Sequence, residues 1–495
     1  MHLVWLKRDL RIEDHGPLFR ASLTEKMMAM YIFEPKRMAQ PDYGANHHAF
    51  IVDSLRELQQ ELVSLNIPLL YFVGEVVEVL STLKSRYKTI HLHSHMEVGG
   101  GWTYDRDKQV KRWCQQQGVE WIEYPIFEVL RPYQNRDQWA TRWREGVDKA
   151  RFPTPHKQSR PVEPPSFPTM TVEPPSSQQV GLGEPAPQRQ QGGRSQGIAL
   201  WQSFLAERGK NYRKEMSSPV TAFDACSRLS PHLAWGTLSI REVYRVATHA
   251  QSTLVSAKHH RRSLDSFISR LHWRGHFMQK LEDQVEIENH CFHPLFEGLR
   301  PQKGNRDYLE AWKEGRTGVP IVDACMRALV ATGWLNFRMR AMVVSFACYN
   351  LWLDWREIRD WLACQFTDYE PGIHISQLQM QAGVTGINAI RVYNPYKQSV
   401  DLDPEGVFIM RWVPELCSIP KEYIHQPFEV PPLIELMLNL DRGGYPQPIV
   451  DVEQTSKQAK ERVFAIKQSL EAKVLSQQVF QRHGSRRKRH SKLEG

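Results

Sequence analysis

One stretch near the middle of the chain carries side chains that could bind nucleic acid. Residues 266–277 read as a single helix, on which Arg270, Trp273, Arg274 and Phe277 share a face. Arginines can hold phosphates while a tryptophan stacks on a base, so this face could be a cationic stacking surface. The alternative is an amphipathic helix whose arginines extend into solvent, and the residues alone favour neither.

A second candidate combines a cation with an apolar helix. Arg340 leads into the strongly apolar run 342–346. An unpaired buried charge costs several kcal/mol, so this arginine should have an acidic partner. Asp368, in the segment that follows, is a plausible one.

The segment 226–233 could bind an anion. Ser230 stands before Pro231, which predicts a helix N-cap followed by proline at the first helical position. Free amides and hydroxyls at a helix start suit a pyrophosphate. Such short patterns also occur as plain helix caps, so a purely structural role stays open.

The first 130 or so residues must fold as a separate unit from these motifs. Apolar strands alternate there with helical stretches, which favours a doubly wound parallel sheet. The strands are expected at 3–6, 28–33, 69–73 and 89–93. Lys7 to Arg11 follow the first strand, at the edge where such sheets bind ligands. No GxGxxG motif is present.

The rest of the chain predicts a connector and a helical domain. We expect a proline-rich connector over 132–197, in which the prolines between 153 and 187 exclude a long helix or a central strand from about 152 onwards. Residues 198–450 read almost entirely as helix, and 451–495 as a helical and basic tail. The basic run 482–490 is either a solvated tail or a nonspecific phosphate contact. We therefore expect an α/β domain over 1–131 followed by an all-α domain.

Composition limits the classes of protein. The 495 residues are 41% hydrophobic and 24% charged, with a net charge of +9, as in a globular protein. The seven cysteines form no CxxC pair, and no carboxylate or cysteine joins His272 and His276, so no metal site is expected. No apolar run is long enough for a membrane span, and the start lacks a signal peptide. We expect a cytoplasmic monomer.

Taken in order, these segments resemble the photolyase/cryptochrome family over roughly residues 1–425. The matching blocks are 3–11, 227–230 with 238–239, 315–327, 332–334, 354–357, 393–395 and 403–406. The resemblance implies an α/β antenna-type domain and an all-α domain that binds FAD. It also allows a second antenna chromophore, whose identity the sequence does not give.

The resemblance also assigns roles to individual residues. Residues that should bind FAD are Tyr212, Ser227, Leu229, Ser230, Phe267, Arg340, Asp368, Glu370 and His374. Those that should contact DNA containing a pyrimidine dimer are Trp273, Arg274, Trp334, Phe337 and Arg338. Catalytic roles fall on Arg270, Trp273, His374 and Trp355. Extrusion of a dimer is physically reasonable because a damaged pair is already poorly stacked.

Several positions depart from the family pattern. Arg270 stands where the family has a glutamate that bonds the dimer, and an arginine can donate hydrogen bonds but no carboxylic acid proton. His374 replaces an asparagine that faces flavin N5. It could protonate N5, favour the anionic reduced flavin as a cation, or be a neutral core histidine. The loop 371–378 also differs from the usual glycine- and asparagine-rich one.

The tryptophan chain through which the family photoreduces FAD is also interrupted. Trp355 matches its middle member, but Leu378 stands at the inner position and Gln302 near the outer one. Trp352 and Trp361 flank Trp355 and could substitute, although each could equally be a packing residue.

Three functions are compatible with these residues. The leading interpretation is a light-driven photolyase that acts on pyrimidine dimers in DNA. The first alternative is a cryptochrome-like blue-light photoreceptor without repair activity, and the second is a light-independent flavoprotein that binds nucleic acid.

Overall fold

A six-stranded sheet forms the N-terminal part of the computed structural model, which describes residues 1–131, 136–254 and 257–485. Its strand order is β5-β4-β1-β2-β3-β6. The strands are β1 His2–Leu6, β2 Met27–Phe33, β3 Leu69–Val73, β4 His91–His95, β5 Glu120–Tyr124 and β6 Met170–Thr171. All neighbours pair in parallel except β6, which runs antiparallel to β3 at the sheet edge.

Both faces of the sheet are buried, which explains the continuous apolar runs. Alternate residues of β1 point to opposite sides: Leu3 and Trp5 join one core cluster, Val4 and Leu6 the other. The first cluster lies under α4 (Val76–Tyr87) and α5 (Gly101–Gln117). The second lies under α1 (Gly16–Ala21) and α3 (Ala45–Ser64).

The predicted fold class is confirmed, with two strands added. β5 is only partly buried and mixes polar with apolar residues, so its sequence carries little strand signal. β6 lies inside the proline-rich segment, where an edge strand of two residues is the kind that proline permits.

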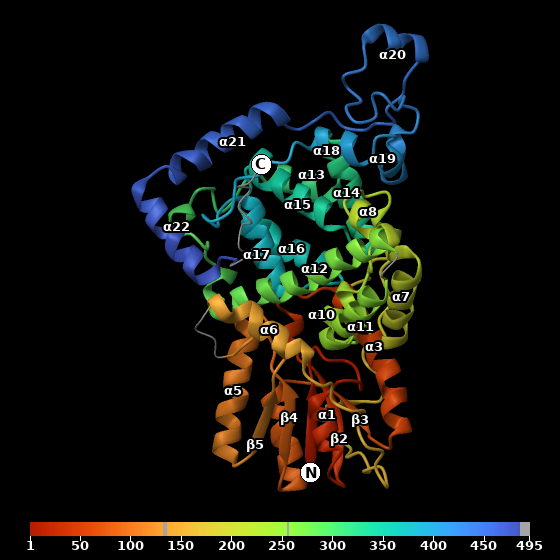
Figure 1. Ribbon diagram of the computed structural model, residues 1–495, viewed down its shortest axis with the longest axis vertical. Helices are drawn as coiled ribbons and strands as arrows, with labels where there is room; N and C mark the ends of the chain where they lie inside the picture. Colours follow the sequence, from red (N-terminus) through yellow and green to blue (C-terminus); the bar gives the residue numbers. More distant parts are fainter. Residues whose placement is uncertain (132–135, 255–256, 486–495) are drawn as a thin grey trace.

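The second part of the described chain is helical (Figure 1). Its longer helices are α7 Arg194–Ala206, α11 Ile240–Thr253, α12 Lys258–Asp283, α13 Arg306–Glu314, α14 Pro320–Thr332, α15 Phe337–Ser345, α16 Trp355–Gln365 and α17 Pro371–Ala382. The largest apolar core lies among α14, α15, the π-helical turn Phe346–Asn350 and α16. α12 crosses beneath this core and packs on α11 and α17.

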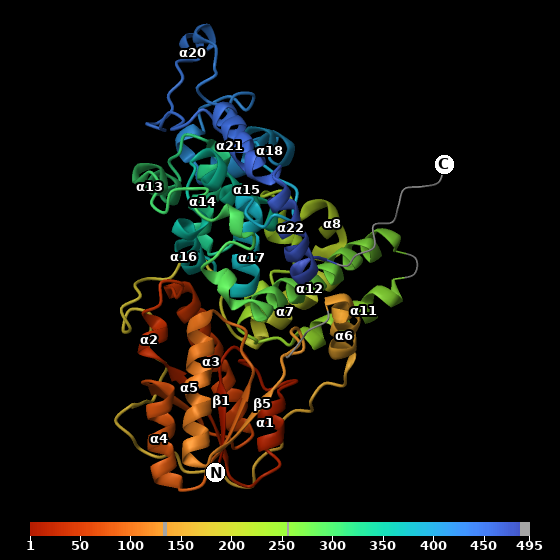
Figure 2. The ribbon, with the colours of Figure 1, turned by 90° about the vertical axis from the view of Figure 1, so that its left-hand side faces the viewer.

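Two helices follow along the outside of the helical part. α21 (Val452–Lys467) packs on the π-helical turn, and α22 (Leu470–His483) descends towards the end of α12 (Figure 2). Residues 486–495, which include most of the basic run, lie outside the described residues. No helix in the described ranges is both long and apolar enough to cross a membrane.

Candidate cofactor and DNA site

The predicted pair of Arg340 and Asp368 is confirmed. A terminal nitrogen of Arg340, in the first turn of α15, lies 2.9 and 2.8 Å from the two carboxylate oxygens of Asp368. Its Nε donates to the carbonyl oxygen of Leu335 at 2.7 Å, and its guanidinium stacks 3.9 Å from the Phe366 ring. The apolar helix therefore begins with a fixed, partly exposed cation.

A second guanidinium, which the sequence analysis did not select, lies close to this pair. Arg228 has a left-handed backbone, with φ of 60°, and its guanidinium lies 4.0 Å from the Trp334 ring. Burial lowers its pKa to about 10, and the charge of Asp368 opposes that shift. Two cations thus share one carboxylate. The motif at 227–230 pointed to the segment, but a positive φ at an arginine cannot be read from sequence.

The prediction that Ser230 is a helix N-cap is wrong, because the backbone turn at Arg228 starts the helix one residue earlier. α10 (Ser230–Ala234) begins at Ser230 itself, Leu229 occupies the cap position, and no side chain caps it. Arg228 turns the chain so that Leu229 is already close to helical geometry. Ser227 instead accepts a bond from the Leu229 amide at 3.4 Å.

The structure brings several predicted cofactor residues together. Tyr212 of α8 (Tyr212–Glu215) and Phe267 of α12 lie 6.3 Å apart in one aromatic cluster. Arg270, one turn further along α12, lies close enough to act on the pKa values of Tyr212 and Cys226. Phe267 is itself almost fully buried, so it supports this wall of the site from behind.

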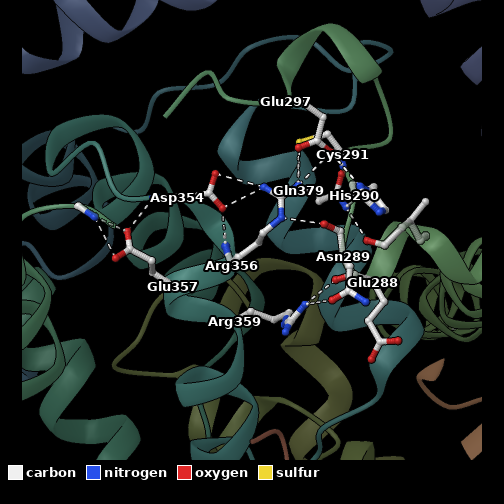
Figure 3. Close-up of polar contacts among 12 residues, drawn as sticks. Glu288, Asn289, His290, Cys291, Glu297, Asp354, Arg356, Glu357, Arg359 and Gln379 are labelled. Carbon is white, nitrogen blue, oxygen red and sulfur yellow. Dashed lines mark hydrogen bonds and ion pairs between the residues drawn. The ribbon is translucent and has the colours of Figure 1, made fainter. Parts of the chain in front are cut away.

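His374 is neutral in this structure. Its Nε2 donates to the carbonyl oxygen of Arg359 at 2.9 Å, and burial lowers its pKa to about 4. Burial therefore disfavours a cationic His374 at neutral pH, and in the neutral ring Nδ1 carries a lone pair. The side chain of Arg359 in turn donates to the backbone carbonyl oxygen of Glu288 and to Oδ1 of Asn289 (Figure 3).

The buried position of Arg274 contradicts the predicted contact with DNA. Its guanidinium binds Glu128 at 3.1 Å and Glu370 at 2.7 Å. Glu370 also lies 3.6 Å from Arg8, which follows β1. Two carboxylates inside the protein hold Arg274, so it joins the two parts of the molecule.

The other residues predicted to contact DNA differ in exposure. Trp273 is half-buried and stacks on Phe277 with ring centroids 5.7 Å apart. Phe337 is 52% exposed, and Arg338 lies over the Tyr393 ring. Trp334 is buried beneath Arg228 and is not open to a large ligand.

Cations lie beside two of the candidate electron-transfer tryptophans. Arg356 stacks on the fully buried Trp355. Trp352 has two guanidiniums, those of Arg300 and Arg462, each at 4.8 Å. A nearby positive charge disfavours loss of an electron from the ring.

Trp361 has a different neighbour. Its ring lies 5.6 Å from that of Trp312, an aromatic contact rather than a cationic one. Of the two residues that flank Trp355, Trp361 is therefore the better placed to give up an electron.

Two polar groups beside the sheet bear on other ligands. Asp9, His15 and His95 are close enough to hold a metal ion. His15 accepts the Leu18 amide at Nδ1, so its Nε2 carries the proton, and this nitrogen lies 2.9 Å from the Asp9 carboxylate that His95 also contacts at 2.7 Å. Glu288 accepts the Gly101 amide at 2.6 Å and so occupies the start of α5.

The donor set fits FAD. Arg228 and Arg340 are partly exposed and together carry one more charge than Asp368 balances. An anion such as a pyrophosphate would supply the missing charge. Ser227 and the aromatic cluster around Tyr212 line the same region. When bound, FAD would supply the light-absorbing, electron-donating group.

Fold and site define a two-part protein that binds a flavin nucleotide in its helical part, and comparisons with known proteins agree. Residues 2–135 match the family model described as DNA photolyase, and 267–465 match that of the FAD binding domain of DNA photolyase. The chain belongs to the photolyase/cryptochrome family.

Some relatives of this chain are named cryptochromes and others photolyases. The chain is 28% identical to a cryptochrome DASH of Gloeobacter violaceus, over 93% of this chain and 95% of the relative. It is 27% identical to a deoxyribodipyrimidine photo-lyase of Escherichia coli, over 92% and 97%.

Solved structures agree with this assignment. A Synechocystis cryptochrome superposes with a TM-score of 0.81 at 26% identity, covering 93% of this chain and 98% of that one. An archaeal photolyase from Sulfolobus tokodaii, described with two FAD molecules, gives 0.74 at 27% identity, covering 94% and 100%.

Proposed function

We propose that this protein is an FAD-dependent photolyase that uses blue light to split pyrimidine dimers in DNA, by electron transfer from reduced flavin. The observation that carries the proposal is the arrangement of α12. This helix holds Phe267 and Arg270 beside Tyr212 and, one turn later, presents the half-buried Trp273. A base that stacks on Trp273 would lie next to the cofactor residues.

Each residue has a defined part in this proposal. Arg228 would supply positive charge to the pyrophosphate, and Arg340, which Asp368 orients, would lie beside the reactive edge of the flavin. Arg270 donates hydrogen bonds to a pyrimidine carbonyl as negative charge develops on it. His374 accepts at Nδ1 and supplies no proton at neutral pH, because its pKa is lowered to about 4.

A second, light-harvesting chromophore is part of the proposal. The crevice between the start of α5 and the α16–α17 segment has a volume of about 240 Å³ and is lined by Arg8, Arg37 and Tyr369. The absorption spectrum of the purified protein, with FAD subtracted, would show whether another pigment is bound.

The alternative function is that of a cryptochrome-like photoreceptor without repair activity. The burial of Arg274 and Trp334 favours this alternative, because neither side chain is then available to contact DNA. The two functions differ in one observable, the fate of a dimer under light.

The deciding experiment is a repair assay on photoreduced protein with a thymine-dimer oligonucleotide, in blue light and in darkness. We expect light-dependent recovery of intact thymines. Arg270→Ala should lower repair per photon at least tenfold with unchanged FAD content, because a charge-assisted hydrogen bond is lost. Absence of recovery with FAD bound and reduced would eliminate dimer splitting and favour photoreception.

A further inference from the structure

A buried group of basic side chains lies where α12, α22 and the segment Arg136–Gln138 meet. Its members are Arg136, His276, Lys280 and His483, with exposed fractions of 8%, 5%, 6% and 1%. They come from three parts of the chain that are far apart in sequence.

Lys280 has no acidic partner within the described chain. Its Nζ contacts only aromatic rings, at 5.0 Å from the centroid of Phe277 and 5.5 Å from that of Phe292. Burial lowers its pKa to about 7, and the charge of Arg136 lowers it further. No carboxylate among residues 1–131, 136–254 and 257–485 opposes these shifts.

The neighbouring groups are one further cation, Arg136, and two imidazoles that stay neutral because burial lowers the pKa of His276 and of His483. Arg136 donates to His276 Nδ1 at 2.6 Å, so the imidazole proton of His276 sits on Nε2. His483 donates from Nε2 to Gln284 at 2.7 Å, while its buried Nδ1 has no partner. His272 and Arg482 also act on these pKa values.

Asp283 is a carboxylate of the described residues that faces the group, and it already has partners. Asp283 lies 3.7 Å from Arg136 and accepts a bond from Gln279 at 2.7 Å. Glu282, the next acid on α12, binds Arg131 and Tyr104 instead. An unpaired buried charge is costly, so such a group either loses its proton or takes its counter-charge from a ligand.

We propose that Arg136, His276, Lys280 and His483 form an anion-binding site that takes a phosphate group. A phosphate accepts several hydrogen bonds at once, and the Nζ of Lys280 and the Nε2–H of His276 can supply them. The Nδ1 of His483 donates only once the anion has drawn a proton onto it, because its Nε2–H is used by Gln284. Its negative charge would restore full protonation of Lys280.

The position of the site suggests its use. Trp273 contacts the His276 ring edge-on with centroids 5.1 Å apart. Lys280 lies one helical turn after His276 on α12. Seven residues of helix separate Trp273 from Lys280, which is roughly 10 Å of rise. A strand stacked on Trp273 could therefore place a backbone phosphate in the site. The site is complete only when α22 is docked, because His483 belongs to that helix.

Thermal unfolding of the full chain tests the proposal without light or repair. At pH 7, ~20 mM inorganic phosphate should raise the melting temperature of the wild type by ~2–4 °C relative to chloride of equal ionic strength. Lys280→Met should abolish this response and leave the melting temperature in chloride unchanged or higher. Lys473→Met, at an exposed position on α22, should respond as the wild type does.

A second, milder variant keeps the proposal testable if Lys280→Met does not fold. His483→Gln should keep its bond to Gln284 and show about half the response to phosphate. A wild type that does not respond, or a Lys280→Met protein that responds fully, overturns the proposal.

The source of the phosphate needs a separate comparison. A lesion-free single-stranded oligonucleotide should stabilise the wild type more than Lys280→Met, and its neutral methylphosphonate analogue should stabilise both equally. That outcome assigns the site to a nucleic-acid backbone. A response to inorganic phosphate alone assigns it to a free anion, and a response to neither ligand refutes it.

Discussion

Two buried charge clusters in this molecule are built in opposite ways. In the α/β part, Arg106 binds Glu34, Glu97 and Asp107 at 3.0, 2.6 and 2.9 Å, so its charge is more than balanced. At the end of α12, Lys280 has only aromatic neighbours and like charges. A saturated cluster needs nothing further and is structural. An unsaturated cluster has capacity left for a ligand.

The cofactor region lies between these extremes. Arg228 and Arg340 share Asp368, which leaves about one positive charge for an anion. Arg274, with two carboxylates, is saturated and belongs with Arg106 despite its place on α12. Charge balance, rather than position on a helix face, therefore separates the binding arginines from the structural ones.

The largest expected effect comes from breaking the saturated cluster. Arg106→Met leaves Glu34 and Glu97 without their cation and Asp107 with Lys7 alone, so the free energy of unfolding should fall by about 3–5 kcal/mol in urea denaturation. Arg112→Met, at an exposed site on the same helix, should change it by less than about 0.5 kcal/mol. A loss below about 1 kcal/mol for Arg106→Met would mean that the cluster is not structural.

A buried neutral histidine should make the free energy of unfolding depend on pH. His47 donates from Nε2 to the carbonyl oxygens of Ala363 and Phe366, and burial lowers its pKa to about 4. In the unfolded chain His47 takes up a proton near pH 6.5, whereas in the folded protein it does so only near pH 4. Its contribution to the free energy of unfolding is therefore fully present above pH 6.5 and falls as the pH drops towards 4.

Replacing His47 should remove part of that dependence. His47→Gln should flatten the stability curve between pH 6.5 and 4 by about 1.4 kcal/mol per pH unit, one proton, as measured by urea titrations at several pH values. His156→Gln, at an exposed site, should leave the slope unchanged. An unchanged slope in His47→Gln would show that His47 is not buried in its neutral form.

The sequence predicted the fold better than the site. Apolar strand runs and helical periodicity are local, and they located β1 to β4 and most helices of the second part. The pair of Arg340 and Asp368 was predictable because a cation entering an apolar helix needs a partner. Arg274 shares a face with Trp273 in sequence, but the acids that bury it come from 128 and 370, which only the tertiary structure brings together.

The charge of His374 was unpredictable for a similar reason. Whether a histidine is a cation or a neutral acceptor depends on burial and on its bond partner, here the Arg359 carbonyl oxygen. Arg228 was overlooked because its role follows from a positive φ, which residue type alone does not indicate. The unsaturated group around Lys280 likewise assembles only when α22 packs on α12.

The smallest effect on stability should come from the cofactor region, where Arg228 and Arg340 share Asp368. Substitution there should change the affinity for FAD instead. Arg228→Met removes a desolvated cation that has no carboxylate of its own, so the unfolding free energy of the FAD-free protein should change by less than about 1 kcal/mol. Its affinity for FAD should fall about tenfold or more, because a charge-assisted bond to the pyrophosphate is lost. Fluorescence titration with FAD measures this, with Arg213→Met at an exposed site as the control. If Arg228→Met instead unfolds the protein while FAD affinity is kept, Arg228 belongs with Arg106, and charge balance does not mark the binding arginines.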